Sequence, residues 1–249
     1  MSGVGGLDLD AVCISLHGRP LFDPLSLAVR PGVIVTVMGP SGCGKSSLLA
    51  FLCGTLPPVF ETSGRILLDG CDIGSLPPER RRLGILFQDD LLFPHMTVGE
   101  NLAFGLPASL RDRAARRARV ERALAEAGLA GFADRDPATL SGGQRARAAL
   151  MRTLLSEPRA LLLDEPFSRL DAPLKERLRS FVFDHARALG LPTLLVTHDP
   201  ADSRAARGPL ITLKTFLSDE SAADAARIGP APIANPPDGL PQTDSGTNI

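Results

Sequence analysis

Val33–Ser46 reads VIVTVMGPSGCGKS, and this stretch determines the fold more than any other part of the chain. Its first six residues form a short apolar run rich in β-branched side chains, and Ser46–Leu52, which follows the glycines, is compatible with a helix. A strand, a glycine-rich loop and a helix in this order form the context of the phosphate-binding pattern G-x-x-x-x-G-K-[ST]. The sequence therefore predicts an α/β domain that binds a nucleoside triphosphate.

The loop within this stretch, Gly39–Ser46 (the P-loop), consists of residues whose chemistry suits a phosphate group. Its glycines let backbone N–H groups approach phosphate oxygens, Lys45 can reach the β- and γ-phosphates, and the Ser46 hydroxyl can bind Mg²⁺. Alone, the loop indicates only nucleoside triphosphate binding. The candidate nucleotide-binding residues of this stretch are Gly39, Pro40, Ser41, Gly42, Cys43, Gly44, Lys45, Ser46 and Ser47.

A second glycine-rich stretch lies much further along the chain, where Leu140–Gln144 reads LSGGQ (the signature stretch). Gly142 and Gly143 leave the backbone donors of this stretch open, which again suits phosphate. One triphosphate rarely needs two such loops from one chain. We therefore expect a site shared between two copies of the chain. One copy would contribute the P-loop, and the other Ser141, Gly142, Gly143 and Gln144.

Two further apolar runs end in residues suited to phosphate chemistry. Ala160–Leu163 is followed by Asp164 and Glu165. His198 lies two residues after the run Thr193–Val196. Short buried strands of this kind belong to parallel sheets, whose carboxyl ends gather ligands. Phosphoryl transfer needs a carboxylate near Mg²⁺ and a base that orients water, and two adjacent acids can divide these roles. The alternatives are a solvated acidic turn and a structural histidine.

The remaining segments predict elements around this core. Leu7–Val29, which glycines and prolines interrupt, and Gly64–Gly70 indicate an antiparallel sheet. Residues 97–156 read mainly as helix, and within them Leu110–Leu129 has helical spacing of its apolar residues. We therefore expect a helical segment between the P-loop strand and the acidic strand end.

Composition sets the limits of this interpretation. The 249 residues are 44% apolar, which suffices for one large α/β domain, expected over residues 1–215. The proline-rich residues 216–249 predict a disordered tail. A net charge of −1 gives no whole-chain attraction to nucleic acid, and the four cysteines lack metal-ligand spacing. The sequence shows neither a signal peptide nor an apolar run of membrane-spanning length, so we expect any membrane role to come through a partner.

An arginine-rich segment is the one part of the chain that could contact nucleic acid. Six arginines fall between Arg111 and Arg122. The alternative is a solvated helix face, which we favour because interleaved aromatic residues, the usual stacking platform for bases, are missing. We therefore expect no nucleic-acid partner.

The P-loop, LSGGQ and the acidic strand end together resemble the ATP-binding subunit of ABC transporters, in which LSGGQ is the family signature. The resemblance covers roughly Leu7–Leu213. It implies a P-loop NTPase core with a mostly parallel sheet, an antiparallel β subdomain and an inserted helical subdomain at about residues 97–156. It also implies ATP and Mg²⁺ as cofactors and a homodimer that binds Mg·ATP between its chains.

The resemblance further implies roles for single residues. Asp164 is similar to the family's Mg²⁺-binding aspartate, Glu165 to the residue that orients the attacking water, and His198 to the histidine that binds the γ-phosphate. Gln88, in GILFQDD, matches the loop that links the nucleotide site to the membrane partner. The implied catalytic residues are Glu165, His198 and Gln88, and the implied metal ligands are Ser46, Gln88 and Asp164.

Two stretches near these residues leave alternatives open. Ser168–Asp171 resembles the loop that lies at the family's dimer interface, but acids also favour an ordinary helix N-terminus. The apolar stretch Leu91–Val98 is compatible with core packing and equally with a surface on which a partner docks.

One position departs from the family pattern. An aromatic residue about 29 positions before the P-loop lysine usually stacks on adenine in this family, and here that position is Leu16. Leucine offers apolar contact but no π face. We expect Leu16 to face adenine, with His17 and Phe22 as alternative contacts.

The variants LSGGQRAR and DEPFSRLD resemble those of importers for iron, thiamine, polyamines or sulfate. The resemblance thus implies an ATPase at the cytoplasmic face of the membrane that drives import through a separate permease, together with a substrate-binding protein. The alternatives are a soluble ABC ATPase that acts on DNA, ribosomes or iron–sulfur assembly, and a non-catalytic nucleotide-binding regulator. The regulator is disfavoured because Glu165 and His198 are both present.

Overall fold

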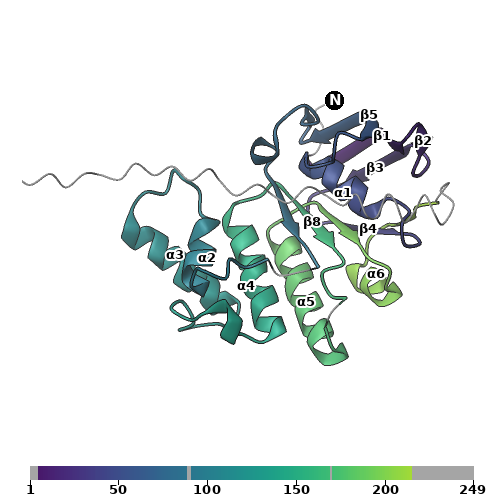
Figure 1. The fold of residues 1–249 in the computed structure, drawn as a ribbon. Coiled ribbons are helices and arrows are strands. Elements are labelled where there is room, and N and C mark those ends of the chain that lie inside the picture. The colour runs from purple at the N-terminus through teal and green to yellow at the C-terminus, as the bar shows by residue number, and fades with distance from the viewer. Residues whose placement is uncertain (1–4, 89–90, 169, 215–249) are drawn as a thin grey trace, which may run out of the picture.

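A computed structural model describes residues 5–88, 91–168 and 170–214 as two five-stranded sheets with six α-helices (Figure 1). The residues for which a disordered tail is predicted, 216–249, lie outside the described part of the chain. The helices are α1 (Lys45–Cys53), α2 (Val98–Phe104), α3 (Arg113–Glu126), α4 (Gly142–Leu155), α5 (Ala172–Ala188) and α6 (Pro200–Ala206). Two short 3-10 helices span Pro78–Arg80 and Pro137–Thr139.

One of the two sheets is parallel throughout and has the strand order β10-β4-β9-β8-β7. The apolar runs that predict a parallel sheet form its three neighbouring central strands. The strands are β4 (Ile34–Met38), β7 (Leu83–Leu86), β8 (Ala160–Asp164), β9 (Thr193–Val196) and β10 (Leu210–Thr212). Because parallel strands end at the same edge of a sheet, the residues that follow β4, β8 and β9 lie at one edge.

The parallel sheet is covered on both faces, which explains why its strands are apolar throughout. Alternate residues of β8 belong to different cores: Leu162 packs with α1 and the antiparallel sheet. Leu161 and Leu163 pack with α4 and α5 on the opposite face. This double burial fixes the strand ends, and it therefore gives the loops beyond them a rigid base.

The second sheet is antiparallel and has the order β2-β1-β5-β6, with β3 also paired to β1. Leu7–Val29 supplies β1, β2 and β3 as predicted, while β5 begins four residues before the predicted Gly64–Gly70 and β6 follows it. Its strands are β1 (Leu7–Leu16), β2 (Arg19–Pro20), β3 (Leu25–Val29), β5 (Phe60–Leu68) and β6 (Cys71–Asp72). The predicted fold class, a mostly parallel sheet with an antiparallel sheet and helices, is confirmed.

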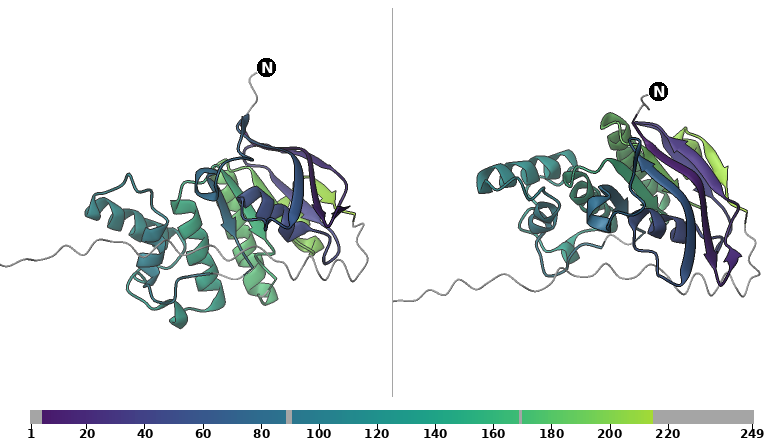
Figure 2. Two further views of the ribbon diagram at one scale, coloured as in Figure 1. Left: turned by 45° about the horizontal axis from the view of Figure 1, so that its top comes forward. Right: turned by 90° about the horizontal axis from the view of Figure 1, so that it is seen from above.

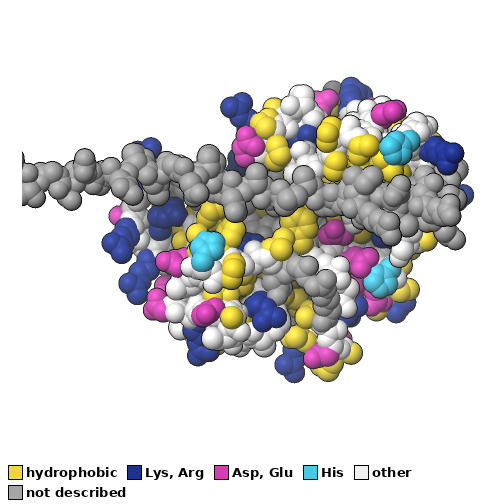
Figure 3. All heavy atoms as spheres, in the orientation of Figure 1, with side chains coloured by type: hydrophobic (Ala, Val, Ile, Leu, Met, Phe, Trp, Pro, Cys, Tyr) yellow, Lys and Arg dark blue, Asp and Glu magenta, His cyan; other side chains and the backbone are white. Residues whose placement is uncertain are grey.

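The helices α2 and α3 lie on the side of the molecule away from the antiparallel sheet (Figures 1 and 2). They share a separate hydrophobic core with α4, in which Leu102, Leu124 and Met151 are buried. Arginine side chains cover the α3 end of the molecule in Figure 3. No helix in the described part of the chain is long and apolar enough to cross a membrane.

Candidate active site

The P-loop connects β4 to α1, and its last glycine, Gly44, occupies a position that does not accommodate a side chain. Gly44 has φ +92°, a left-handed conformation that side chains rarely adopt. A Cβ atom at this position would also lie 3.0 Å from Leu21 and 3.1 Å from Phe22. Gly44 therefore lets the loop turn sharply into α1 against the antiparallel sheet.

The N-terminus of α1 is prepared for an anion. Its N-cap, Gly44, provides no side-chain hydrogen bond, so the first N–H groups of the helix have no side-chain cap. Lys45 is only 8% exposed, and its Nζ donates to the carbonyl oxygens of Gly39 and Pro40, each at 2.8 Å. The ammonium group thus lies folded over its own loop. The Ser46 side chain is exposed and Ser47 is half-buried.

Cys43 packs the P-loop from within. It is fully buried, and its Sγ lies 3.9 Å from the Nζ of Lys45. Burial raises the pKa of the Cys43 thiol, and the nearby Lys45 charge lowers it by a smaller amount. We conclude that Cys43 supports the loop as an uncharged thiol.

Asp164 ends β8, the strand next to β9. Burial and, to a smaller extent, the adjacent Glu165 raise the pKa of its carboxyl group to about 6, while the Lys45 charge opposes the rise. Because the Lys45 charge lowers the pKa of Asp164, the ammonium group of the P-loop lies close enough to interact with this carboxyl group. A further positive charge near Asp164 would therefore favour the charged form of its carboxyl group.

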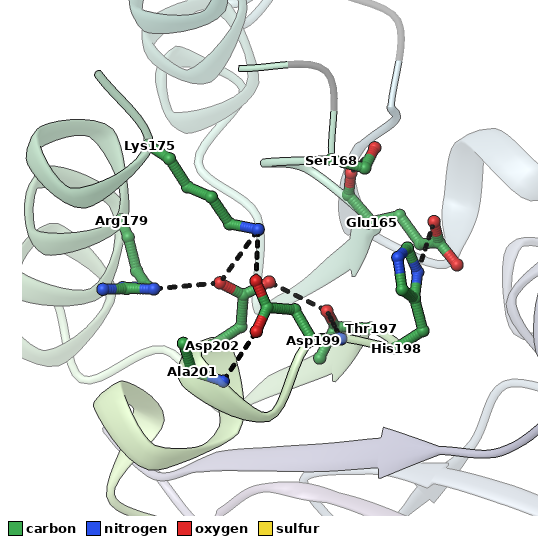
Figure 4. A network of polar contacts seen from close by, with 9 residues as sticks. All are labelled: Glu165, Ser168, Lys175, Arg179, Thr197, His198, Asp199, Ala201 and Asp202. Carbon is green, nitrogen blue, oxygen red and sulfur yellow. Dashed lines mark hydrogen bonds and ion pairs between the residues drawn. The ribbon is translucent and has the colours of Figure 1, made fainter. Parts of the chain in front are cut away.

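Glu165 and His198 meet across the ends of β8 and β9. The Nδ1 of His198 lies 3.1 Å from an Oε of Glu165 (Figure 4). The His198 side chain is 64% exposed and that of Glu165 only 24%, so the imidazole can reach solvent while the acid is half-buried. Glu165 has a left-handed backbone (φ 45°), and its N–H donates to the carbonyl oxygen of Val196 at 2.9 Å. The sheet therefore holds this acid in place from both strands.

The signature stretch forms the start of α4. Ser141 is the N-cap, and Ser141 and Gln144 form a reciprocal capping box. Among the described residues, no atom outside the backbone of its own helix would lie nearer than 3.8 Å to a Cβ on Gly142, whereas a Cβ on Gly143 would lie 2.4 Å from Leu174 of α5. Gly142 is therefore open to an approaching group, while Gly143 allows α4 to pack closely on α5.

Comparison with known proteins identifies the family of this arrangement. The ABC transporter family matches residues 22–168, which include the P-loop, the signature stretch and the acid pair. The chain belongs to the ABC transporter family. It is 50% identical over 196 residues to the uncharacterized ABC transporter ATP-binding protein YnjD of Escherichia coli K12, and this match covers 77% of the chain and 90% of that protein.

Longer ABC relatives carry names that state a cargo. The chain is 45% identical over 203 residues to the Fe(3+) ions import ATP-binding protein FbpC 1 of Rhizobium meliloti, covering 82% of the chain and 57% of that protein. It is 46% identical over 190 residues to FbpC of Brucella abortus strain 2308, covering 76% of the chain and 53% of that protein. The chain thus spans little more than half the length of these iron-import relatives. As an ABC transporter ATP-binding protein, it is an ATPase coupled to transport.

Gln88 lies beyond the end of β7, in the same parallel sheet whose strand β8 leads to Asp164 and Glu165. It is exposed and comes two residues after the end of β7, where Leu86 pairs with Leu163 of β8. Gln88 therefore follows the strand beside the one that carries Asp164. Asp171 caps α5 by accepting from the N–H of Leu174 at 2.9 Å, so this residue forms a helix N-terminus, and its place at a dimer interface stays a prediction.

The structure does not support an adenine contact by Leu16. Leu16 is 4% exposed, pairs with Phe60 in the antiparallel sheet and belongs to the hydrophobic core. Phe22 is also fully buried. Both side chains belong to the buried core, and neither offers a free face to a base. His17, which is exposed and has φ 52°, is the remaining candidate of the three.

Sequence reasoning missed a group of charged residues behind His198. Lys175 and Arg179 of α5 form ion pairs with Asp199 and Asp202 at the start of α6 (Figure 4). The available signal was the spacing of Asp171, Lys175 and Arg179, which places one residue per turn on a single face of a helix. That signal is weak, because charged residues at this spacing usually face solvent.

Proposed function

We propose that two copies of this chain bind two Mg·ATP molecules between them and that closure of the pair drives import through a separate membrane permease. In this proposal the ATPase lies at the cytoplasmic face of the membrane and a substrate-binding protein delivers the cargo. The observation that carries the proposal is the pair of phosphate-suited helix ends in one chain. One is the start of α1 at the P-loop, and the other is the start of α4 at the signature stretch.

The residues of the P-loop side fit a magnesium ion. Carboxylate, hydroxyl and amide oxygens are suitable ligands for Mg²⁺, and Asp164, Ser46 and Gln88 carry them. The pKa of about 6 at Asp164 reflects a buried carboxylate beside a second acid, which a divalent cation would stabilise in its charged form. When bound, Mg²⁺ would neutralise charge on the ATP phosphates.

Glu165 and His198 divide the remaining chemistry. The Glu165 carboxylate, on a residue whose backbone N–H donates to the Val196 carbonyl oxygen, would accept a proton from the water that attacks the γ-phosphate. His198 is largely exposed, so its imidazole could leave Glu165 and donate to a γ-phosphate oxygen. Lys45 would exchange its bonds to the carbonyl groups of Gly39 and Pro40 for bonds to the β- and γ-phosphates.

We assign residues 97–156 to a helical subdomain within an ATP-binding domain that covers residues 1–215. The separate core shared by α2, α3 and α4 supports this division. At its edge Leu91 and Phe104 are 52% and 53% exposed, and Phe104 stacks edge-on against Phe93 at 4.9 Å. Arg152 holds this region by donating to the Leu91 carbonyl at 2.8 Å. We propose that these apolar side chains contact the permease.

Complementation between two inactive variants tests the shared site. Lys45→Ala removes the P-loop cation, and Ser141→Arg places a bulky charge at the signature stretch. Each variant alone should lack ATPase activity. A verified heterodimer of the two should regain activity, because one of its two sites has an intact P-loop and an intact signature stretch.

Thr97→Arg is a matched control for the signature variant, since Thr97 is also a helix N-cap in a capping box but belongs to α2. The Thr97→Arg homodimer should remain active, because it loses a capping box but keeps the signature stretch. An inactive Lys45→Ala/Ser141→Arg heterodimer with a normal melting curve would refute the shared site.

Co-purification tests the permease against a soluble partner. The chain with Phe104→Asp should no longer co-purify with an integral membrane protein, while its own ATPase activity persists. Leu189→Asp, at a residue 59% exposed after α5, is the control and should leave co-purification intact. Recovery of ribosomes, DNA or an iron–sulfur assembly protein instead would favour the soluble alternative.

A further inference from the structure

The two neighbours of His198 in the chain, Thr197 and Asp199, are anchored by hydrogen bonds. Thr197 donates through Oγ1 to an Oδ of Asp202 at 2.8 Å and accepts from the N–H of Asp199 at 3.1 Å. The Asp199 carboxylate accepts from the N–H of Ala201 at 2.7 Å. The backbone on both sides of His198 is thus fixed, and the position of its ring depends on that backbone.

The anchor leads to α5 through ion pairs that are partly buried. Lys175 Nζ lies 2.5 Å from Asp199 Oδ2 and 3.9 Å from Asp202 Oδ1, and Arg179 Nη1 lies 3.1 Å from the same oxygen of Asp202. Asp202 is only 2% exposed. The hydrogen bond from Lys175 lowers the pKa of Asp199. Lys175 forms ion pairs with the carboxylates of both Asp199 and Asp202 (Figure 4).

The same face of α5 begins at the residue that resembles the family's dimer-interface loop. Asp171 is the N-cap, and its carbonyl accepts from the N–H of Lys175 at 2.8 Å, the first bond of the helix. Lys175 therefore belongs to the first turn of α5. Any shift of that turn moves the cation that holds Asp199 and Asp202.

We propose that Lys175 and Asp202 are positioning residues for ATP hydrolysis, which hold His198 in register with the first turn of α5. The inference rests on the proposed role of His198 at the γ-phosphate. It implies that the start of α5 and the His198 loop move as one unit. A partner chain that contacts Asp171 would then also determine the position of the His198 imidazole, without contacting that ring itself.

Steady-state ATPase measurements on the full chain test this inference. Lys175→Met should lower kcat roughly 10- to 100-fold, because a displaced catalytic group is costly, with the KM for ATP changed less than about threefold. Lys175→Arg, which keeps a cation of similar reach, should restore most of the activity. If Lys175→Met does not fold, Lys175→Gln retains a donor without the charge and replaces it.

Arg187→Met is the matched control. Arg187 also ties α5 to α6, donating at 2.7 Å to the carbonyl of Ala206, but at the far end of α6. It should leave kcat near the wild-type value. Equal losses in Lys175→Met and Arg187→Met would mean that general packing of α5 on α6 matters, and would overturn the inference.

A double-mutant cycle separates this inference from the function on which it rests. His198→Ala should cost much activity in the wild type and little more in the Lys175→Met background, since both changes remove the same group from its place. Fully additive losses would overturn the positioning role while leaving His198 catalytic. An unchanged kcat for His198→Ala alone would refute the proposed role of His198 and the inference together.

Discussion

The P-loop and the signature stretch are both rich in glycine, yet the structure requires glycine in them for different reasons. In the P-loop, Gly44 adopts a left-handed backbone and touches Leu21 and Phe22, so its own conformation excludes a side chain. In the signature stretch, Gly143 is helical, and a Cβ at its position would meet Leu174 of a neighbouring helix. The adjoining Gly142 is restricted by no described atom within 3.8 Å.

This difference agrees with the proposal that two chains each contribute one part of the site. Around the P-loop a single chain gathers a cation, two acids and a histidine from the ends of neighbouring parallel strands. The start of α4 offers open backbone donors and a capping box. Gly142 is best explained by space kept free for something outside the chain, in agreement with the proposed dimer.

Glu165→Gln tests the P-loop end with the largest expected effect. Loss of the base should lower ATP turnover by roughly 10²- to 10⁴-fold, while ATP binding persists because the P-loop is untouched. The variant should also accumulate an ATP-bound dimer. Phosphate release and gel filtration with ATP measure the two effects. Turnover near the wild-type value would show that the P-loop end of one chain does not supply the base.

Stability against pH tests whether charge strain is concentrated at the P-loop end. The pKa of Asp164 is raised from 3.8 to about 6, so between these values the metal-free folded protein holds a proton that the unfolded chain has lost. The free energy of unfolding therefore falls as pH rises through this window, by about 1–3 kcal/mol at most from this group.

Asp164→Asn removes that contribution, together with the coupling of Asp164 to Glu165 and Lys45, while groups elsewhere titrate equally in both proteins. The two should have similar stability near pH 4, and the variant should be the more stable one at pH 7. Denaturant unfolding at several pH values without magnesium measures this. Saturating Mg·ATP should reverse the order at pH 7, because asparagine is a poorer ligand for the cation. Parallel pH curves for the two proteins would argue against strain at Asp164.

Alanine substitutions sharpen the contrast between the two glycine stretches. Gly44→Ala should lower the free energy of unfolding by about 1–3 kcal/mol, through backbone strain and contact with Leu21. Gly142→Ala should leave it unchanged or raise it by up to about 1 kcal/mol, because alanine favours a helix. If Gly142→Ala keeps its stability but loses ATPase activity, the open glycine serves a ligand or partner.

Gly143→Ala provides the intermediate case. We expect a loss of about 1 kcal/mol, because the new methyl group displaces Leu174. Combining it with Leu174→Ala should remove most of the clash, so that the double variant is no less stable than Leu174→Ala alone. Chemical denaturation of the four proteins would decide this. A Gly143→Ala loss that persists without Leu174 would place the restriction in the backbone, as at Gly44.

The parallel sheet could be predicted because its signal is local. The run Thr193–Val196 became β9 with the same bounds, and the expected strands at the P-loop and at Asp164 differ from β4 and β8 by one residue. Each is short and apolar throughout, as strands buried on both faces must be. The residues just beyond these strands therefore fall at one edge whatever the details of the packing.

Contacts between distant segments could not be predicted in this way. Nothing in Arg80-Arg81-Arg82 distinguishes the middle arginine, yet Arg81 is buried and donates to the carbonyls of Phe51 and Leu52 at the end of α1. The close packing of Gly143 on Leu174, which leaves no room for a Cβ, likewise depends on how α5 packs. The same holds for the ion pair between Lys175 and Asp202. Such contacts require the tertiary structure, because the partners carry no mutual spacing in the sequence.

Adenine recognition gives the smallest expected effect and concerns the antiparallel sheet beside the P-loop. Because Leu16 is core, Leu16→Tyr should overpack the sheet and destabilise it by about 1–3 kcal/mol without tightening ATP binding. His17→Asn tolerates the left-handed backbone but loses the ring. If that ring stacks on adenine, ATP affinity should fall by about 0.5–1.5 kcal/mol, roughly two- to twelve-fold.

Discrimination between ATP and GTP should change little in His17→Asn, since stacking contacts the face of a base and not its hydrogen-bonding edge. Fluorescent-nucleotide titration and melting curves of both variants measure these effects. Tighter ATP binding by Leu16→Tyr at an unchanged melting temperature would mean that residue 16 turns out of the core towards the base. The adenine contact at the P-loop end would then form only when nucleotide binds. The P-loop end would differ from the signature stretch only in the residues that one chain supplies for the phosphates.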